Sequence, residues 1–186
     1  MKTDPIQEFI IQNEESLSIA EAVSEALPKA RHQMALGFLA RLEVQIKKHH
    51  PGWVFRKEGT FFIPEQYAAY EFLKPNWVEH YQLKLQFCDG GKKMVFGVIG
   101  PCDDSLHDDL LPKIKLEFPM AKQFKKDGWE AIINMDYPAP DWRRSDILWR
   151  MFTEEIFLNE VANELLKLAK ISEPIIDQLV LARVTT

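Results

Sequence analysis

The stretch HYQLKLQFCDGGKKMVFGV, residues 80–98, decides the fold. From Tyr81 to Phe87 apolar side chains alternate with polar ones, the period of a strand with one buried and one exposed face. Asp89-Gly90-Gly91 supplies residues that tolerate the left-handed backbone of a hairpin turn. The more evenly apolar run at 94–99 predicts a return strand nearer the centre of the sheet. The stretch therefore predicts an antiparallel hairpin.

Upstream of the hairpin, the sequence predicts helices and a second pair of strands. Residues 16–27 are compatible with a helix, which Pro28 is expected to interrupt. A stronger helix is predicted at 33–50, where apolar residues recur at every fourth position. Two short strands are expected over 53–64, followed by a brief helix over 65–73.

Downstream, the alternation at 129–137 predicts another strand, with Trp129 on the same face as Ile133. The longest helix is expected over 145–170, and a last helix begins at 172 with a proline in its first turn. This order of elements predicts an α+β fold. We expect an antiparallel sheet of about four or five strands, with the N- and C-terminal helices packed on one face.

Charge is distributed unevenly over the 186 residues, whose formal net charge is −5. The first 27 residues contain six acidic side chains and one basic side chain, Lys2. We therefore predict an acidic helical N-terminal segment at 1–32 and a single α+β domain at 33–186, a size that can bury a proper core. Two later stretches, 41–57 and 113–126, are basic, as solvated helix faces often are.

Composition limits the class of protein. The two cysteines are too few for a disulfide framework and lack the paired spacing of a zinc site, so no metal is expected. No apolar run approaches the roughly 20 residues of a membrane span, and the acidic N-terminus does not resemble a signal peptide. Glycine-rich phosphate loops and nucleophile motifs are absent, so no cofactor is expected. These observations predict a cytoplasmic protein that does not contact membranes.

The polar face of the first hairpin strand carries a residue pattern that is also found in metal-dependent nuclease sites. Gln82 and Lys84 have the spacing of the Glu/Gln-x-Lys motif by which one large nuclease superfamily holds its metal. In that chemistry acidic groups bind a divalent cation and the lysine orients the attacking water. Glu65, which follows a proline, is the candidate for the second metal-binding group. The alternative, which we favour, is that Gln82 and Lys84 are only the polar face of a half-exposed strand.

A second candidate site combines tryptophan with arginine. The run DWRRSDILW, residues 141–149, places Trp142 and Trp149 around Arg143 and Arg144. Tryptophan and arginine are the residues most enriched among the anchors of protein interfaces. We predict a binding surface made of Trp142, Arg143 and Arg144, with Lys125 and Lys126 nearby. The alternative is that both tryptophans fill the join between the sheet and the long helix.

Several segments together resemble a known type of domain. They are YQLKLQF, MVFGVIG, an amphipathic helix with Leu106 and Leu110, GWEAIINMDYP and DWRRSDILWRMF. The pattern resembles the C-terminal α+β domain attached to some bacterial and phage nucleases of the PD-(D/E)XK superfamily. In those relatives the nuclease core precedes this domain, whereas only a short helical segment lies upstream here. The resemblance implies an accessory module in a phage or defence setting and carries over no catalytic residue.

The leading functional hypothesis is a non-catalytic accessory domain that binds a macromolecule. A protein is the first choice of partner and a nucleic acid the second, because phosphate contacts need clustered basic residues and the net charge is negative. One alternative is a divergent metal-dependent nuclease that uses Glu65, Gln82 and Lys84. The other is a subunit whose role is oligomer assembly. The sequence leaves the oligomeric state open.

Overall fold

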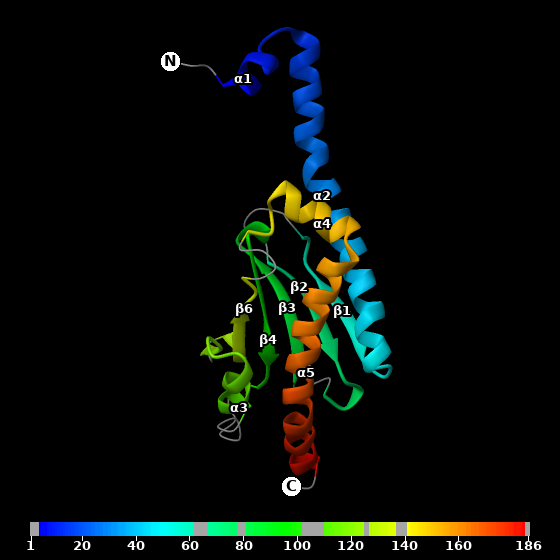
Figure 1. Ribbon diagram of the computed structural model, residues 1–186, viewed down its shortest axis with the longest axis vertical. Helices are drawn as coiled ribbons and strands as arrows, with labels where there is room; N and C mark the ends of the chain where they lie inside the picture. The colour runs from blue at the N-terminus through cyan, green and yellow to red at the C-terminus, as the bar shows by residue number, and fades with distance from the viewer. Residues whose placement is uncertain are drawn as a thin grey trace.

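The computed structural model describes residues 4–61, 67–77, 81–101, 110–124, 127–136 and 141–184 (Figure 1). Over these ranges the chain forms one antiparallel sheet and five α-helices, so the predicted α+β class is confirmed. The sheet has six strands, slightly more than expected.

The strands lie side by side in the order β1-β2-β3-β4-β6-β5, and each pairs antiparallel with its neighbours. Their bounds, in the same order, are Val54–Glu58, Ala68–Leu73, Gln82–Cys88, Lys93–Ile99, Trp129–Asn134 and Lys122–Phe124. The predicted hairpin forms β3 and β4, which occupy the centre of the sheet. In the turn between them Asp89, Gly90 and Gly91 all have positive φ, at 52°, 63° and 87°, as the sequence predicted.

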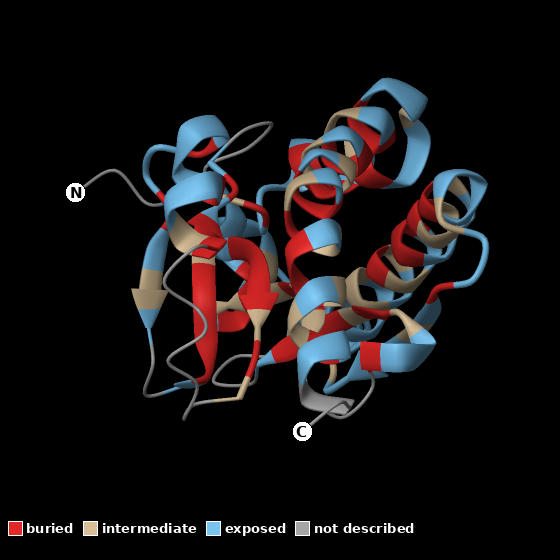
Figure 2. Cartoon of the chain, turned by 90° about the horizontal axis from the view of Figure 1, so that it is seen from below, coloured by how far each residue is buried: buried red, intermediate tan, exposed pale blue. Residues whose placement is uncertain are grey.

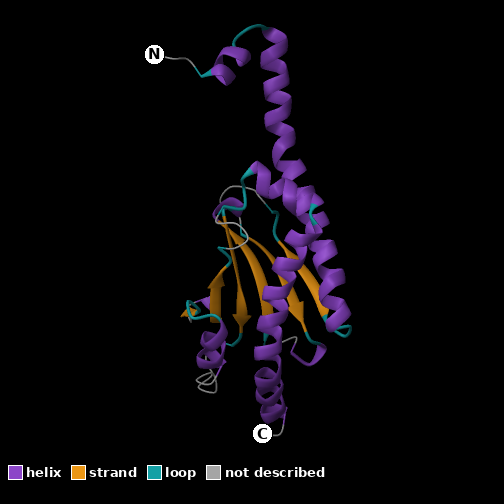
Figure 3. Cartoon of the chain, in the orientation of Figure 1, coloured by secondary structure: helices purple, strands orange, loops and turns teal. Residues whose placement is uncertain are grey.

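The helices are α1 (Pro5–Ile10), α2 (Glu14–His49), α3 (Leu110–Glu117), α4 (Ser145–Thr153) and α5 (Glu155–Val184). Figure 3 shows α5 and the lower part of α2 on the same side of the sheet, with α4 crossing α2 at the sheet's upper end. The N- and C-terminal helices therefore pack on one face, which confirms the predicted arrangement.

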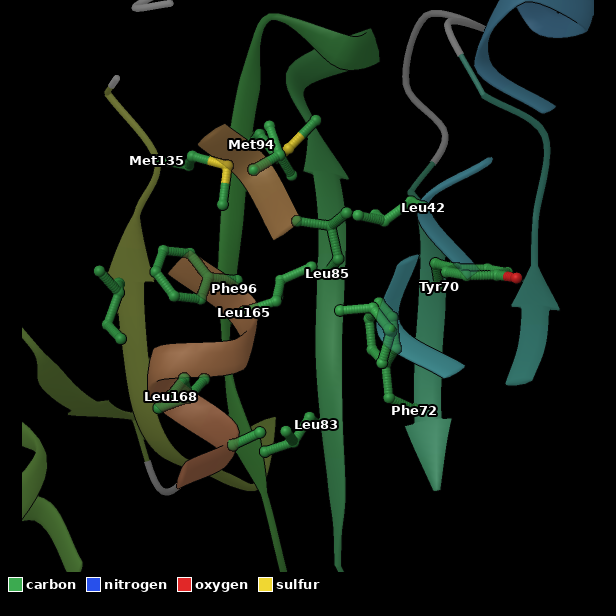
Figure 4. Close-up of a cluster of buried hydrophobic side chains, with 14 of the residues drawn as sticks. Leu42, Tyr70, Phe72, Leu83, Leu85, Met94, Phe96, Met135, Leu165 and Leu168 are labelled. Atoms are coloured by element: carbon green, nitrogen blue, oxygen red, sulfur yellow. The ribbon is translucent and has the colours of Figure 1, made fainter. Parts of the chain in front are cut away.

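The core lies between this layer of helices and the sheet, where the buried side chains gather (Figure 2). Leu83, Leu85 and Phe87 of β3 point into it, and the residues between them point to the opposite face. Figure 4 shows Leu83 and Leu85 beside Leu165 and Leu168 of α5. The period-two pattern of β3 thus fixed which of its side chains are buried, as removal of apolar surface from water requires.

The segment predicted as a helix at 65–73 instead forms β2 from Ala68 onward. Tyr70 and Phe72 face the core, while Glu71 between them faces away from it. This short apolar run has no polar face of helical period, and pairing with β1 and β3 on both sides favours the strand. Residues 62–66 lie outside the described part of the chain.

The helix boundaries also differ from the predictions. Pro28 lies inside α2 and Pro174 inside α5, and neither proline ends its helix. A proline removes one backbone hydrogen bond, and the long helical segments on both sides tolerate that loss. The expected single helix over 145–170 is divided at Glu154, whose extended backbone lets α4 turn across α2 while α5 follows the sheet (Figure 1).

A bulge moves Trp129 to the face opposite the one predicted. The register between β4 and β6 shifts between Val98 and Ile99, so that Trp129 rather than Glu130 pairs with Ile99. A bulge of one residue reverses the facing of the side chains beyond it. Ala131 and Ile133 are in the core, whereas Trp129 lines a pocket on the face away from the helices.

The first part of α2 projects beyond the sheet and, with α1, forms a helical arm of residues 4–28 (Figure 1). Asn13 caps α2 by accepting a hydrogen bond from the backbone N–H of Ser16 at 2.8 Å. Apart from Ser16, which is covered at the α1–α2 corner, the buried residues of α2 begin at Ala35. The boundary expected between residues 32 and 33 therefore falls inside a continuous helix, close to where burial begins.

Candidate functional site

The face of the sheet turned away from the helices holds a pocket of about 350 Å³. Its lining comes from the five neighbouring strands β1, β2, β3, β4 and β6 and from residues just outside them, and it includes Glu58, Tyr67, Lys84, Gln86 and Trp129. The alternation of β3 places Lys84 and Gln86 there, because the same period buries Leu83 and Leu85 on the other side. This pocket is where the predicted nuclease chemistry would have to lie.

Lys84 is held in this pocket by two carboxylates. Its ammonium nitrogen lies 3.1 Å from Glu58 Oε2 and 3.4 Å from Glu71 Oε1. Glu71 lies directly opposite Lys84 on the neighbouring strand β2. The side chain of Glu71 is only 14% exposed and that of Lys84 only 13%. The positive charge of Lys84 is therefore balanced within the fold, and the group has no excess positive charge for a phosphate.

The structure brings together only part of the predicted nuclease set. Gln82 lies on the same face of β3 as Lys84 but does not line the pocket, and Glu65 is outside the described residues. Within the described ranges no group of three or more His, Cys, Asp and Glu side chains is arranged to hold a metal ion. The sequence analysis does not identify Glu58 and Glu71 as partners of Lys84. The alternation of apolar and polar residues in β2 is a signal for Glu71, but the prediction of a helix over 65–73 conceals it.

A second cluster of charged groups joins the end of α2 to the last turns of α5. The ammonium of Lys74 lies 2.9 Å from Glu173 Oε1 and 2.6 Å from Asp177 Oδ2, and Glu173 Oε2 lies 3.3 Å from His50 Nδ1. Trp77 donates its indole N–H to Asp177 Oδ1 at 2.9 Å. This cluster fastens α5 to the loop after β2.

Burial and pairing act on these groups in opposite directions. Burial lowers the pKa of His50, and the nearby carboxylate of Glu173 only partly offsets it. For Lys74, burial favours the neutral form, but hydrogen bonds to Asp177 and Glu173 outweigh it and raise its pKa. Lys74 is therefore held charged between its two carboxylates, while His50 is held toward its neutral form.

The predicted surface of Trp142, Arg143 and Arg144 is divided by the fold. Trp142 is fully buried, its ring packs against Phe87 and Phe157, and its indole N–H donates to the carbonyl of Met135 at 3.2 Å. Trp142 therefore belongs to the core and the prediction of an exposed Trp142 was wrong, because the indole fills the join between the sheet and α5.

Arg143 and Arg144 are exposed, as predicted, but each has a carboxylate beside it. Arg143 Nε lies 3.5 Å from Asp141, and Arg144 makes two hydrogen bonds to Asp146 at 3.0 Å and 2.9 Å. The hydrogen bonds from Arg144 also lower the pKa of Asp146. This pairing leaves the segment without local excess charge. Lys125 and Lys126 lie outside the described residues.

Exposed apolar side chains gather instead around the base of the arm. Trp149 is 61% exposed, its ring centroid lies 6.0 Å from that of Phe152, and Ile156 follows at the start of α5. Their helices pack against α2, where Arg41 donates a hydrogen bond to the carbonyl of Met151. Of the two tryptophans in the run 141–149, only Trp149, which was not part of the predicted surface, is exposed.

The arm itself continues the apolar face of α2 into solvent. Val23 and Leu27 occupy the same helix face as Met34 and Phe38, since the spacings of four and seven residues return to one side of a helix. Phe38 is buried, with its ring packed against Phe157 of α5, whereas Val23 and Leu27 are exposed. Leu17 and Ile19 of the arm are exposed as well. A stripe that is covered in the body of the protein is thus uncovered in the arm.

Comparisons with protein families, with curated proteins and with solved structures give no match to this chain. Within the described ranges, no helix has the length and apolar character needed to cross a membrane.

Proposed function

We propose that this chain is a non-catalytic accessory domain that binds another protein through its helical arm. The observation that carries the proposal is the uncovered apolar stripe of α2, which leaves Val23 and Leu27 in solvent while Phe38, on the same face, is buried. Apolar helix faces bury themselves against another element in stable folds. A partner that covers the arm removes this apolar surface from water.

The charge of the arm favours a protein partner over a nucleic acid. Residues 4–28 contain six acidic side chains and no basic one. Such a surface repels phosphates, which bind to clustered lysine and arginine. Arg143 and Arg144, the strongest basic candidates from the sequence, are paired with Asp141 and Asp146. The partner segment is therefore expected to be apolar and basic.

The base of the arm supplies aromatic anchors of the kind that dominate protein interfaces. Trp149 and Phe152 are exposed, and α4, which carries them, crosses α2 where the arm leaves the body (Figure 1). Large exposed aromatic side chains are the usual hot spots of binding. We therefore include Trp149 and Phe152 in the proposed surface, with Arg143 and Arg144 at its rim.

Site-specific photo-crosslinking in the native host tests the proposal. A photoreactive phenylalanine analogue replaces Val23 on the apolar stripe in one version of the chain and Glu25 in the control. Two helical positions that are two residues apart differ by about 200° around the axis, so the control faces the opposite side. The proposal requires a defined crosslinked protein from position 23 and a much weaker product from position 25. Equal products from both positions, or none from either, would show that the stripe is not a binding face.

A further inference from the structure

A second surface of the chain has the chemistry that the arm requires. We call it the basic edge, and it comprises exposed residues of α3, the following turn and β5, namely Lys113, Lys115, Leu116, Met120, Lys122 and Phe124. Leu116 is 81% exposed and lies one helical turn after Lys113. Glu117, the acidic residue of α3, is paired with Lys167 at 2.9 Å. The basic edge therefore combines exposed apolar side chains with basic charge.

We propose that the arm of one molecule binds the basic edge of a second copy of the same chain. This inference rests on the proposed function and names the partner. The arm carries six of the 28 acidic residues and none of the 23 basic residues, so its formal charge is −6 and the rest of the chain carries a net charge of +1. The arm is negatively charged and the basic edge carries exposed lysines, and such complementary charge favours encounter of the two surfaces.

The arrangement must join different surfaces of two molecules. Two arms carry the same negative charge, and this repulsion disfavours their symmetric pairing. Nor does an arm reach its own basic edge, because it projects beyond one end of the sheet while α3 lies toward the other (Figure 1). A contact between two different surfaces joins molecules head-to-tail. Each added molecule still has one free surface, so the assembly grows into a ring or a filament unless one of the surfaces is blocked.

Two variants separate the surfaces. The arm variant, Val23→Gln with Leu27→Gln, keeps good helix formers at two exposed positions. The edge variant, Lys113→Glu with Leu116→Gln, changes two exposed residues of α3. Val44→Gln is the matched control, because Val44 is on the body part of α2 and is 58% exposed, against 57% for Val23. Unchanged circular dichroism and melting temperature in each variant confirm that the fold is intact.

Light scattering after size exclusion gives the mass of each species at about 100 µM protein, in about 50 mM and about 500 mM NaCl. We expect the wild type and Val44→Gln to exceed the monomer mass of 21.7 kDa at least twofold at low salt. High salt should reduce that mass. The arm variant and the edge variant should each be monomeric, with a dissociation constant raised about tenfold or more.

Mixing the two variants gives the decisive result. The arm variant keeps a working basic edge and the edge variant keeps a working arm, so an equimolar mixture should form a 1:1 dimer and stop there. A wild type that is monomeric at low salt, or a mixture that stays monomeric, overturns the proposal. If position 23 nevertheless crosslinks to a different protein in the host, the proposed function stands and only its assignment to a second copy fails.

Discussion

Lys84 and Glu71 face each other across β3 and β2, with 3.4 Å between their charged groups, on the side of the sheet opposite the helices. Glu58 approaches the same ammonium from β1 at 3.1 Å. The lysine whose spacing from Gln82 is like that of a nuclease motif is thus the centre of an ion-pair network that joins three strands. A structural role in the sheet accounts for its position.

Removal of the Lys84 charge should destabilise the fold. Lys84→Met leaves the carboxylate of Glu71 almost buried without its cation, which costs about 2 kcal/mol of unfolding free energy. Lys84→Met combined with Glu71→Leu should recover most of the loss, because an apolar pair replaces the ionic one. Urea denaturation measures both. Lys93→Met is the control, because its pair with Asp89 is exposed and a change within about 0.5 kcal/mol is expected. Equal effects at Lys84 and Lys93 would contradict this role.

Gly97, which lies opposite Lys84 on β4, should not tolerate a side chain. A Cβ atom at this position would lie 1.9 Å from the carbonyl oxygen of Ala131 on β6. We expect Gly97→Ala to reduce the unfolding free energy by about 2 kcal/mol or more, since backbone must shift to relieve the clash. Gly37→Ala is the matched control in the interior of α2, where nothing lies within 4 Å, and it should stabilise by about 0.5–1 kcal/mol. Thermal melts of the two variants should therefore move in opposite directions.

Stability should fall on mild acidification because of His50. Its pKa is lowered in the folded state, mainly by burial, so the unfolded chain binds the proton more readily. Stability is therefore complete above the unfolded pKa of about 6.5 and decreases as pH falls below it. Urea midpoints at about pH 7.5 and about pH 5.5 measure the loss. His50→Gln should reduce the dependence on pH, whereas His49→Gln, at the exposed neighbouring position, should keep it. Identical pH profiles for all three proteins would refute the assignment.

The 142–144 segment should respond differently at its buried and exposed positions. Trp142→Ala empties a fully buried site between Phe87 and Phe157 and should cost about 3–5 kcal/mol. Arg143→Glu with Arg144→Glu should leave the melting temperature nearly unchanged, because both side chains are exposed. If these arginines belong to the binding surface, the same double variant should weaken capture of the crosslinked partner. A collapse of its melting temperature would instead make them structural.

The central hairpin could be predicted because its signals are local. The alternation from Tyr81 to Phe87 fixes which side chains are buried, and Asp89-Gly90-Gly91 permits the positive φ of the turn. Both follow from the geometry of adjacent residues, which the sequence contains in full. The apolar stripe of α2 from Phe38 onward could be predicted for the same reason, because its period is also a property of residues close together in the sequence.

The candidate sites could be predicted only in part, because they depend on residues far apart in the chain. Nothing near Lys84 in sequence indicates that Glu58 and Glu71 will lie beside it; strand order and register decide this. Burial of Trp142 and exposure of Trp149 likewise follow from how α4 turns across α2 after the join.

The sequence by itself determined the α+β class, the hairpin and the acidic character of the N-terminal segment, since periodicity, turn residues and charge are properties of neighbouring positions. The tertiary structure decided which face of the sheet Trp129 occupies, which carboxylates neutralise Lys84, and where the apolar stripe of α2 leaves the core. These outcomes depend on a bulge, a strand register and the edge of the packed body, which arise only when distant segments compete to bury apolar surface and pair their charges.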